Sequence, residues 1–185
     1  LFQSLTKAVP GGQSALLFGW LKTLYPIWSR CGPEEIRIST TLGLSELALS
    51  GCTMSSDHLY LFPNGATLDD TIFAAQEVGL RFYPTRGSMS IGESLGGLPP
   101  DSLVEKEQDI INDCIRLIDK FNDTSPASMI RIGLAPCSPF SVTRELMRDT
   151  AVLARDKKVT LHTHLAENEE DLSLIHISEP TRHNA

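Results

Sequence analysis

Apolar and polar positions along the chain follow two alternating patterns. Five segments either carry apolar residues at helical spacing or are apolar enough, over a sufficient length, to form a buried helix. These segments are residues 16–28, 32–51, 66–80, 102–121 and 144–158. The shorter stretches between and after them lack helical periodicity, and we interpret them as strands: residues 52–63, 81–89, 129–136 and 159–165. The pattern predicts a regular alternation of helices and strands.

Signals for the ends of helices support these segments. Pro33 suits the first turn of the second helix, Glu35 is favourable at its positive end, and Gly51 suits its stop. Gly79 closes the third helix in the same way. Thr143 is placed to cap the last helix with its hydroxyl.

The alternation of helices and strands predicts the fold. Strands joined by crossover helices must be parallel, in a sheet covered on both faces or closed as a barrel. Both architectures place functional groups at the carboxyl ends of the strands. Each predicted strand has a polar cluster at that end: SSDH, TRGSMS, APCSPFS and THLAE. No GxGxxG follows a predicted strand, so we expect an α/β fold of the (β/α) barrel type rather than a dinucleotide-binding sheet.

Composition restricts the classes of function. The chain has 41% hydrophobic and 21% charged residues, as expected of a globular domain with a real core. Its net charge of -7 argues against a surface that follows nucleic-acid phosphates, although a single nucleobase remains a suitable ligand. No apolar stretch approaches the length of a membrane span, and no signal segment opens the chain. We therefore expect a small-molecule ligand, no nucleic acid and no membrane.

The four cysteines indicate the redox environment. Cys31, Cys52, Cys114 and Cys137 lie far apart, without CxxC or other regular spacing. A disulfide framework or a zinc ribbon is therefore not expected. A reducing, cytoplasmic location fits this use of cysteine.

The segment VTLHTHLAENEE, residues 159–170, contains the clearest candidate for metal chemistry. His162 and His164 lie two residues apart, so on a strand both would point to one face and could bind a divalent metal. The alternative is an ordinary polar strand end. Glu167 follows after a turn, where a carboxylate can move protons for a metal-activated water. It could instead be the first acidic residue of the run that follows, at the start of a helix.

Other polar residues at strand ends are candidates for substrate binding. Arg86 could hold the carbonyl group or ring nitrogen of a heterocycle, or could be an ordinary ion-pair partner in a loop. Cys137 and Ser138 offer small polar groups at the next strand end. Cys137 is not expected to be a nucleophile, because no His or Asp lies near it in sequence to lower its pKa. His58 is either a pocket residue or a structural histidine.

Five motifs together resemble one enzyme family. They are LFQSLTKAVP, LSGCTMSSDHLYLFPNG, TRGSMSIGESLGGLPPDS, LAPCSPFSVT and LHTHLAENEED, within residues 1–171. They resemble the amidohydrolase superfamily, in the branch of 8-oxoguanine deaminases and hydroxytriazine aminohydrolases. The resemblance implies a (β/α)8 barrel, of which this chain would hold about strands 2 to 5. It makes His164 the metal ligand after the fifth strand, His162 its neighbour, and Glu167 the proton-shuttling residue.

The resemblance also implies an activity. We expect a metal-dependent hydrolytic deaminase of an oxidised purine base, 8-oxoguanine, releasing urate and ammonia. Hydroxylated s-triazines, isocytosine and guanine are alternative substrates. The ion would be zinc or iron, the substrate would contact Arg86, Cys137, Ser138 and His58, and the protein would form a homo-oligomer. A non-catalytic barrel fragment or binding module is the alternative from another class.

The two ends of the chain carry further expectations. The resemblance places an HxH pair of ligands just before Leu1 and a His and an Asp after residue 171, so we expect no stable metal binding or deaminase activity from these residues alone. The stretch from Leu172 to Arg182 departs from the family pattern and resembles a translated sequencing adapter. We therefore expect a partial barrel over residues 1–171 and a non-native tail over 172–185.

Overall fold

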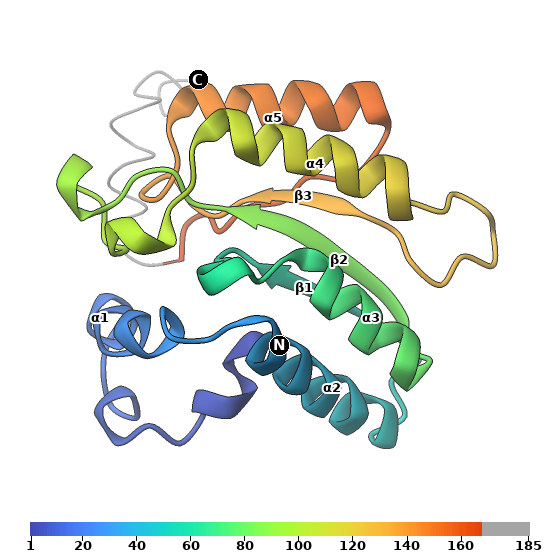
Figure 1. Ribbon diagram of the computed structural model, residues 1–185, viewed down its shortest axis with the longest axis horizontal. Helices are drawn as coiled ribbons and strands as arrows, with labels where there is room; N and C mark the ends of the chain where they lie inside the picture. Colours follow the sequence, from blue (N-terminus) through green and yellow to red (C-terminus); the bar gives the residue numbers. More distant parts are fainter. Residues whose placement is uncertain (168–185) are drawn as a thin grey trace, which may run out of the picture.

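The computed structural model describes residues 1–167 and contains a parallel sheet (Figure 1). Its strands are β1 (Met54–Leu59), β2 (Arg81–Ser88) and β3 (Gly133–Pro136), in the order β1-β2-β3. Both pairings are parallel. Beyond β3, Leu161 forms a parallel bridge with Leu134, so the segment after the last helix takes a fourth position along the sheet.

Helices connect the strands and cover them. They are α1 (Leu17–Trp28), α2 (Pro33–Leu49), α3 (Leu68–Val78), α4 (Glu107–Phe121) and α5 (Arg144–Lys157). In Figure 1, α4 and α5 lie above the strands, whereas α2 and α3 lie below. Among residues 1–167, no helix combines the length and the apolar character that crossing a membrane requires. This arrangement confirms the predicted α/β fold with parallel strands and crossover helices.

The predicted helix signals are confirmed in atomic detail. Pro33 is the first residue of α2, and the Glu35 carboxylate accepts a hydrogen bond of 2.7 Å from the Gly32 N–H. Gly79 ends α3 with φ of 78°, a left-handed conformation that glycine adopts without a Cβ penalty. The Thr143 hydroxyl accepts a hydrogen bond of 3.0 Å from the Leu146 N–H at the start of α5.

Two predicted elements differ from the structure. The fourth helix begins at Glu107 rather than Ser102, because residues 101–103 form a separate 3-10 turn and Val104 is extended. The stretch 159–165 forms a single bridge at Leu161 instead of a regular strand. A strand needs a partner along its length, and among residues 1–167 this segment has one on the β3 side only.

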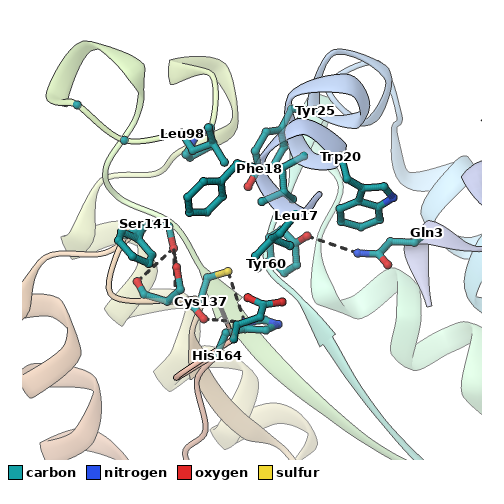
Figure 2. Close-up of a pocket in the computed structure, with 17 residues that line it drawn as sticks. Gln3, Leu17, Phe18, Trp20, Tyr25, Tyr60, Leu98, Cys137, Ser141 and His164 are labelled. Atoms are coloured by element: carbon teal, nitrogen blue, oxygen red, sulfur yellow. Dashed lines mark hydrogen bonds between the residues drawn. The ribbon is translucent and has the colours of Figure 1, made fainter. Parts of the chain in front are cut away.

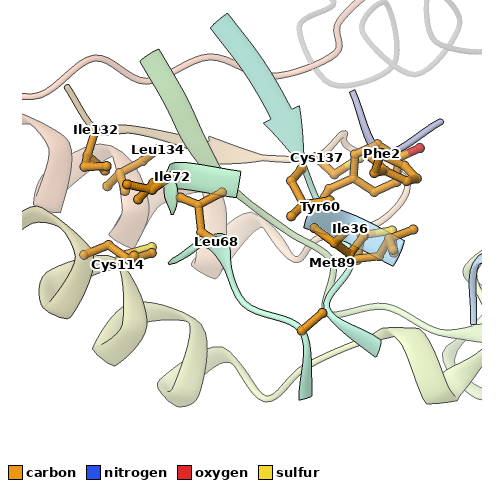
Figure 3. Close-up of a cluster of buried hydrophobic side chains, with 14 of the residues drawn as sticks. Phe2, Ile36, Tyr60, Leu68, Ile72, Met89, Cys114, Ile132, Leu134 and Cys137 are labelled. Atoms are coloured by element: carbon orange, nitrogen blue, oxygen red, sulfur yellow. The ribbon is translucent and has the colours of Figure 1, made fainter. Parts of the chain in front are cut away.

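Apolar side chains from the strands and helices form one buried cluster (Figure 3). Trp28 of α1 is fully buried, and the Phe2 ring meets it edge-on with centroids 5.0 Å apart. Ile72 and Leu134 are also inaccessible to solvent. This packing joins the residues before α1 to the sheet, so the opening segment and α1 are held beside the strand ends.

The parallel register brings the polar strand ends together. His58 of β1 pairs with Thr85 of β2, and Arg86 pairs with Leu134 of β3. Gly87 permits this close approach, because a Cβ atom there would lie 2.2 Å from the Leu59 carbonyl oxygen. The polar clusters of successive strands therefore meet at one edge of the sheet, as parallel strands require.

An ion-pair cluster fixes α3 against α4. The Asp69 carboxylate of α3 accepts hydrogen bonds of 3.0 and 2.6 Å from Arg116 and one of 2.8 Å from Lys120. Burial raises the pKa of Asp69, but the hydrogen bonds and charges of Arg116 and Lys120 outweigh burial, and the pKa lies below its ordinary value. The charged carboxylate is therefore favoured in the folded state.

This pKa shift predicts a dependence of stability on pH. A carboxyl group with a depressed folded pKa stabilises the protein above its unfolded pKa of about 3.9 and loses that contribution as pH falls further. Asp69→Asn should therefore be less stable than wild type at neutral pH, and the difference should shrink below about pH 4. Urea unfolding across this range measures it. Asp149→Asn, at the exposed pair with Arg148, is the control and should show little difference at any pH. A gap for Asp69→Asn that is constant with pH would contradict the assignment.

Candidate active site

A pocket of about 450 Å³ opens where the strand ends meet α1 (Figure 2). Its floor includes His164, Glu167 and Cys137. Its walls come from α1 on one side and from residues 138–141 on the other, and residues 96–99 complete the rim. Figure 2 shows Cys137 and His164 at one end of the pocket, with Phe18 and Leu98 at the other. The pocket therefore has a polar end and an apolar end.

Three histidines gather beneath the polar end. His58 stacks on His164 with ring centroids 4.6 Å apart and lies 5.0 Å from the His162 ring. Each ring has a partner that restrains it. His58 Nε2 lies 3.1 Å from the Ala135 carbonyl oxygen, and His164 Nδ1 lies 2.7 Å from that of Cys137. His162 Nε2 lies 3.2 Å from the Thr85 hydroxyl.

Burial favours the uncharged forms of His58, His162 and Cys137. It lowers the pKa of His58 to about 3, with further lowering from His164 and His162. Burial also lowers the pKa of His162. It raises the pKa of the Cys137 thiol to about 12, with an opposing hydrogen bond from Ser141. Neutral imidazoles keep a lone pair available, and a protonated thiol is a poor nucleophile, which agrees with the expectation for Cys137.

The structure brings most of the predicted site residues together. His164, Glu167, Cys137 and Ser138 line the pocket. His58 lies directly against His164 at the polar end. Their contact supports the interpretation of the strand ends as one site, while their roles in binding and catalysis stay predictions.

Arg86 is the exception, because its contacts match the ion-pair alternative. Its side chain is 2% exposed and does not line the pocket. The guanidinium donates to both carboxylate oxygens of Glu105, at 2.9 and 2.7 Å, and to Asp113 at 2.7 Å. Its remaining contacts are the Gly87 carbonyl oxygen and the ring of Phe62. In this structure the guanidinium is therefore held by its ion-pair partners, and the substrate contact expected of Arg86 stays a prediction.

Several pocket residues were missed by reasoning from the sequence. The α1 residues Phe18, Trp20 and Tyr25 face the pocket, although the sequence indicated only a buried helix. Phe18 meets Phe140 edge-on across the opening, with centroids 5.8 Å apart. A signal did exist for Tyr60, because it lies two residues after His58 and extended backbone points such residues to one face.

The donor set at the polar end suits a transition-metal ion. His58, Cys137 and His164 each offer one ligand atom, and these atoms lie within 4.8 Å of one another. Zinc binds imidazole nitrogen and thiolate sulfur at about 2.0 to 2.3 Å, which requires donors within about 4 Å of one another. The residue types at this end of the pocket therefore fit zinc.

Comparisons with known proteins agree with this geometry. The chain matches the amidohydrolase family over residues 11–183. It is 48% identical to the 8-oxoguanine deaminase of Pseudomonas aeruginosa, covering 94% of this chain and 39% of that protein. It is 36% identical to the hydroxydechloroatrazine ethylaminohydrolase of Pseudomonas sp. strain ADP, covering 83% of this chain and 32% of that protein.

Solved structures show the same likeness. The atrazine chlorohydrolase of Arthrobacter aurescens TC1, complexed with zinc, superimposes with a TM-score of 0.85 at 29% identity, covering 97% of this chain and 42% of that one. A triazine hydrolase variant gives a TM-score of 0.84 at 34% identity, covering 90% and 38%. The chain thus spans about two fifths or less of the length of these proteins. Its parallel strands with crossover helices form part of a (β/α) barrel, and the chain belongs to the amidohydrolase family.

Proposed function

We propose that the protein is a metal-dependent hydrolytic deaminase that converts 8-oxoguanine and water to urate and ammonia. The observation that carries this proposal is the polar end of the pocket, where His164, stacked on His58, and the Glu167 carboxylate line the same cavity. The identity of 48% to an 8-oxoguanine deaminase supports the choice of substrate. The proposal concerns the protein at the length of its relatives.

His164 is the residue that would hold the catalytic ion. Its Nδ1 atom lies 2.7 Å from the Cys137 carbonyl oxygen, which can only accept, so Nδ1 carries the proton and Nε2 is left as a metal donor. A bound divalent ion supplies a water molecule that is acidic enough to lose a proton near neutral pH. Zinc and iron both remain candidates, and zinc is present in a solved relative.

Glu167 would move the proton that this reaction requires. Its carboxylate lines the same pocket as His164, within reach of a substrate placed there. It would accept a proton from the attacking water and deliver it to the nitrogen that leaves as ammonia. One water is consumed and one ammonia is released, so the carboxylate returns to its starting state after each turnover.

The rest of the pocket suits a planar heterocycle. Ser138 offers a hydroxyl and Cys137 a neutral thiol to its polar edge. Phe18, Trp20 and Phe140 supply aromatic surface that can contact the ring faces. Polar groups at one end and aromatic walls along the side are typical of a site that binds a nucleobase.

A hydroxylated triazine is the second candidate substrate. The pocket is also lined by the apolar side chains of Leu17, Leu21 and Leu98, which could contact an alkyl substituent. Hydroxydechloroatrazine ethylaminohydrolase, a relative at 36% identity, acts by its name on such a molecule. Isocytosine and guanine, like 8-oxoguanine, carry no alkyl substituent for this apolar end, and they stay alternative substrates.

Location and assembly complete the proposal. We infer a cytoplasmic enzyme, because all four cysteines are free and none of them pairs with another. We retain the homo-oligomer as a prediction. Size-exclusion chromatography with light scattering measures it directly.

Ammonia release from a substrate panel tests the proposed function. The protein at the length of its relatives is assayed with 8-oxoguanine, a hydroxylated triazine, isocytosine and guanine, and its metal content is measured. We expect the highest kcat/KM with 8-oxoguanine and about one equivalent of zinc or iron. The 185-residue chain, assayed in parallel, should show no turnover. Absence of ammonia with every substrate in a metal-loaded sample would instead favour the non-catalytic binding module.

A further inference from the structure

Glu107 connects two segments that border the pocket, although it does not line the pocket itself. It is the first residue of α4. Its Oε1 atom accepts a hydrogen bond of 3.1 Å from the Ser90 hydroxyl and one of 2.6 Å from the Thr143 hydroxyl. Ser90 follows β2, and Thr143 directly precedes α5. One carboxylate oxygen therefore joins the loop after β2 to the loop before α5.

This carboxylate also sets the direction of the surrounding hydrogen bonds. A carboxylate oxygen accepts, so both hydroxyls donate to Glu107 and their own oxygens can accept from the backbone. The Ser90 Oγ atom accepts from the Thr143 N–H at 3.4 Å, and the Thr143 Oγ1 atom accepts from the Leu146 N–H at 3.0 Å. Hydrogen bonds to a carboxylate are about twice as strong as those between neutral groups. The network is therefore centred on the Glu107 side chain.

The rim of the pocket, residues 96–99, folds back on the start of its own loop. The Gly97 N–H donates to the Gly92 carbonyl oxygen at 2.9 Å. The Glu93 N–H donates to the Pro99 carbonyl oxygen at 3.0 Å. These two bonds close the loop on itself, so the position of the rim depends on the residues that directly follow β2.

The wall formed by residues 138–141 is bonded to the same place. The Ser141 carbonyl oxygen accepts from the Ser90 and Ile91 N–H groups at 2.7 and 3.1 Å. Within the wall, the Ser138 N–H donates to the Ser141 hydroxyl at 3.1 Å. The rim and the wall are thus joined at the Ser141 carbonyl, beside the hydroxyl groups that donate to the carboxylate.

We propose that Glu107 is a positioning residue that holds the rim and the wall of the pocket in fixed relation to each other. The simpler role for an acidic residue in the first turn of α4 is to interact with the positive end of that helix. The hydrogen bonds of Glu107 favour the wider role, because they end on two other segments of the chain. The effect on turnover rests on the proposed function, whereas the effect on the two loops does not.

Hydrogen–deuterium exchange of the 185-residue chain tests the role of Glu107 in the two loops. Glu107→Ala should speed exchange of the Ser90 and Ile91 amides by about tenfold or more, since hydrogen bonds to a charged group are lost, while α3 exchanges as in wild type. Asp109→Ala is the matched control, because it removes an exposed carboxylate from the same turn, and it should leave both amides unchanged. Glu107→Gln should restore most of the protection, because its amide oxygen can accept from both hydroxyls.

A second variant and a kinetic measurement complete the test. Ser90→Ala removes one of the two donors to Glu107 and should speed exchange at Ile91 by a smaller factor, which decides the proposal if Glu107→Ala does not fold. In the protein at the length of its relatives, Glu107→Ala should raise KM for 8-oxoguanine by about threefold to tenfold and leave kcat within about twofold. Glu107→Gln should return KM to the wild-type value.

The outcomes separate this proposal from the proposed function. Exchange in Glu107→Ala that matches wild type, or that Asp109→Ala reproduces, would overturn the proposal. An unchanged KM in an active enzyme would overturn the role of Glu107 in placing the substrate. Absence of turnover in wild type would count against the deaminase alone, and the exchange of the two amides would still decide whether Glu107 holds the loops.

Discussion

Replacing Arg86 by alanine should lower the free energy of unfolding by about 3 to 5 kcal/mol, the usual cost of removing one partner of a buried ion pair. Arg86 is 2% exposed, while the side chains of Glu105 and Asp113 are 26% and 24% exposed. The variant leaves these two carboxylates facing each other across the space that held their cation. Water can reach the partly exposed carboxylates of Glu105 and Asp113 and solvate their charges, which recovers part of this cost. We therefore expect a loss near the lower end of the range.

The position of Arg86 explains why its loss would reach the pocket. Arg86 lies at the end of β2, next to Gly87, and its partners lie in the segment before α4 and within α4 itself. The same segment is connected to a pocket residue through Met89, because the Glu105 N–H donates to the Met89 carbonyl oxygen at 3.0 Å and the hydroxyl of Tyr25, which lines the pocket, contacts the Met89 sulfur at 3.8 Å. Loss of the guanidinium therefore frees the turn that leads from β2 to α4.

Urea unfolding of matched variants tests this prediction. Arg148→Ala removes an arginine from the exposed pair with Asp149 and should change stability by less than about 1 kcal/mol. Arg86→Lys keeps the charge but cannot reproduce the forked contacts with Glu105 and Asp113, so it should recover only part of the loss. An Arg86→Ala variant as stable as the Arg148→Ala control would contradict a structural role.

Local signals in the sequence were sufficient for the order of elements. Capping residues and helix-ending glycines can be recognised from the few residues around them in the sequence. Pro33, Gly79 and Thr143 mark helix ends in the structure as predicted. The parallel order follows from crossover helices without any knowledge of distant contacts. The start of α4 was misplaced, because residues 101–103 form a separate 3-10 turn before an extended Val104.

The site was harder to predict, because its contacts join residues far apart in the chain. Nothing near Arg86 in sequence shows that Glu105 and Asp113 will meet its guanidinium. The stacking of His58 on His164 likewise joins residues more than a hundred positions apart. Residues at strand ends were found because the fold class alone places them at one edge.

The α1 wall shows a different limit of sequence reasoning. The segment 16–28 is apolar over most of its surface, so no single face can be assigned to the core from periodicity. In the structure, Trp28 is fully buried, whereas Phe18 and Trp20 face the pocket. Aromatic residues serve equally for packing and for binding a flat ligand, and only the position of the helix distinguishes the two.

Replacing Glu167 by glutamine should reduce kcat for ammonia release by about 10² to 10⁴-fold, the usual contribution of a positioned general acid and base. Glutamine keeps the size and polarity of the side chain but cannot take up or deliver a proton at neutral pH. The experiment uses the protein at the length of its relatives, with metal content measured in each sample. Metal content should be unchanged, because His164 is the residue proposed to hold the ion and Glu167 is proposed to move the proton.

The matched control for Glu167→Gln is Glu145→Gln, an identical change at an exposed position in the first turn of α5. It should retain nearly full activity, which separates loss of the proton carrier from loss of one negative charge. KM for 8-oxoguanine should change little in Glu167→Gln if the carboxylate acts on the proton rather than on substrate binding. A variant that keeps kcat, or one that loses activity only by losing its metal, would show that another group moves the proton.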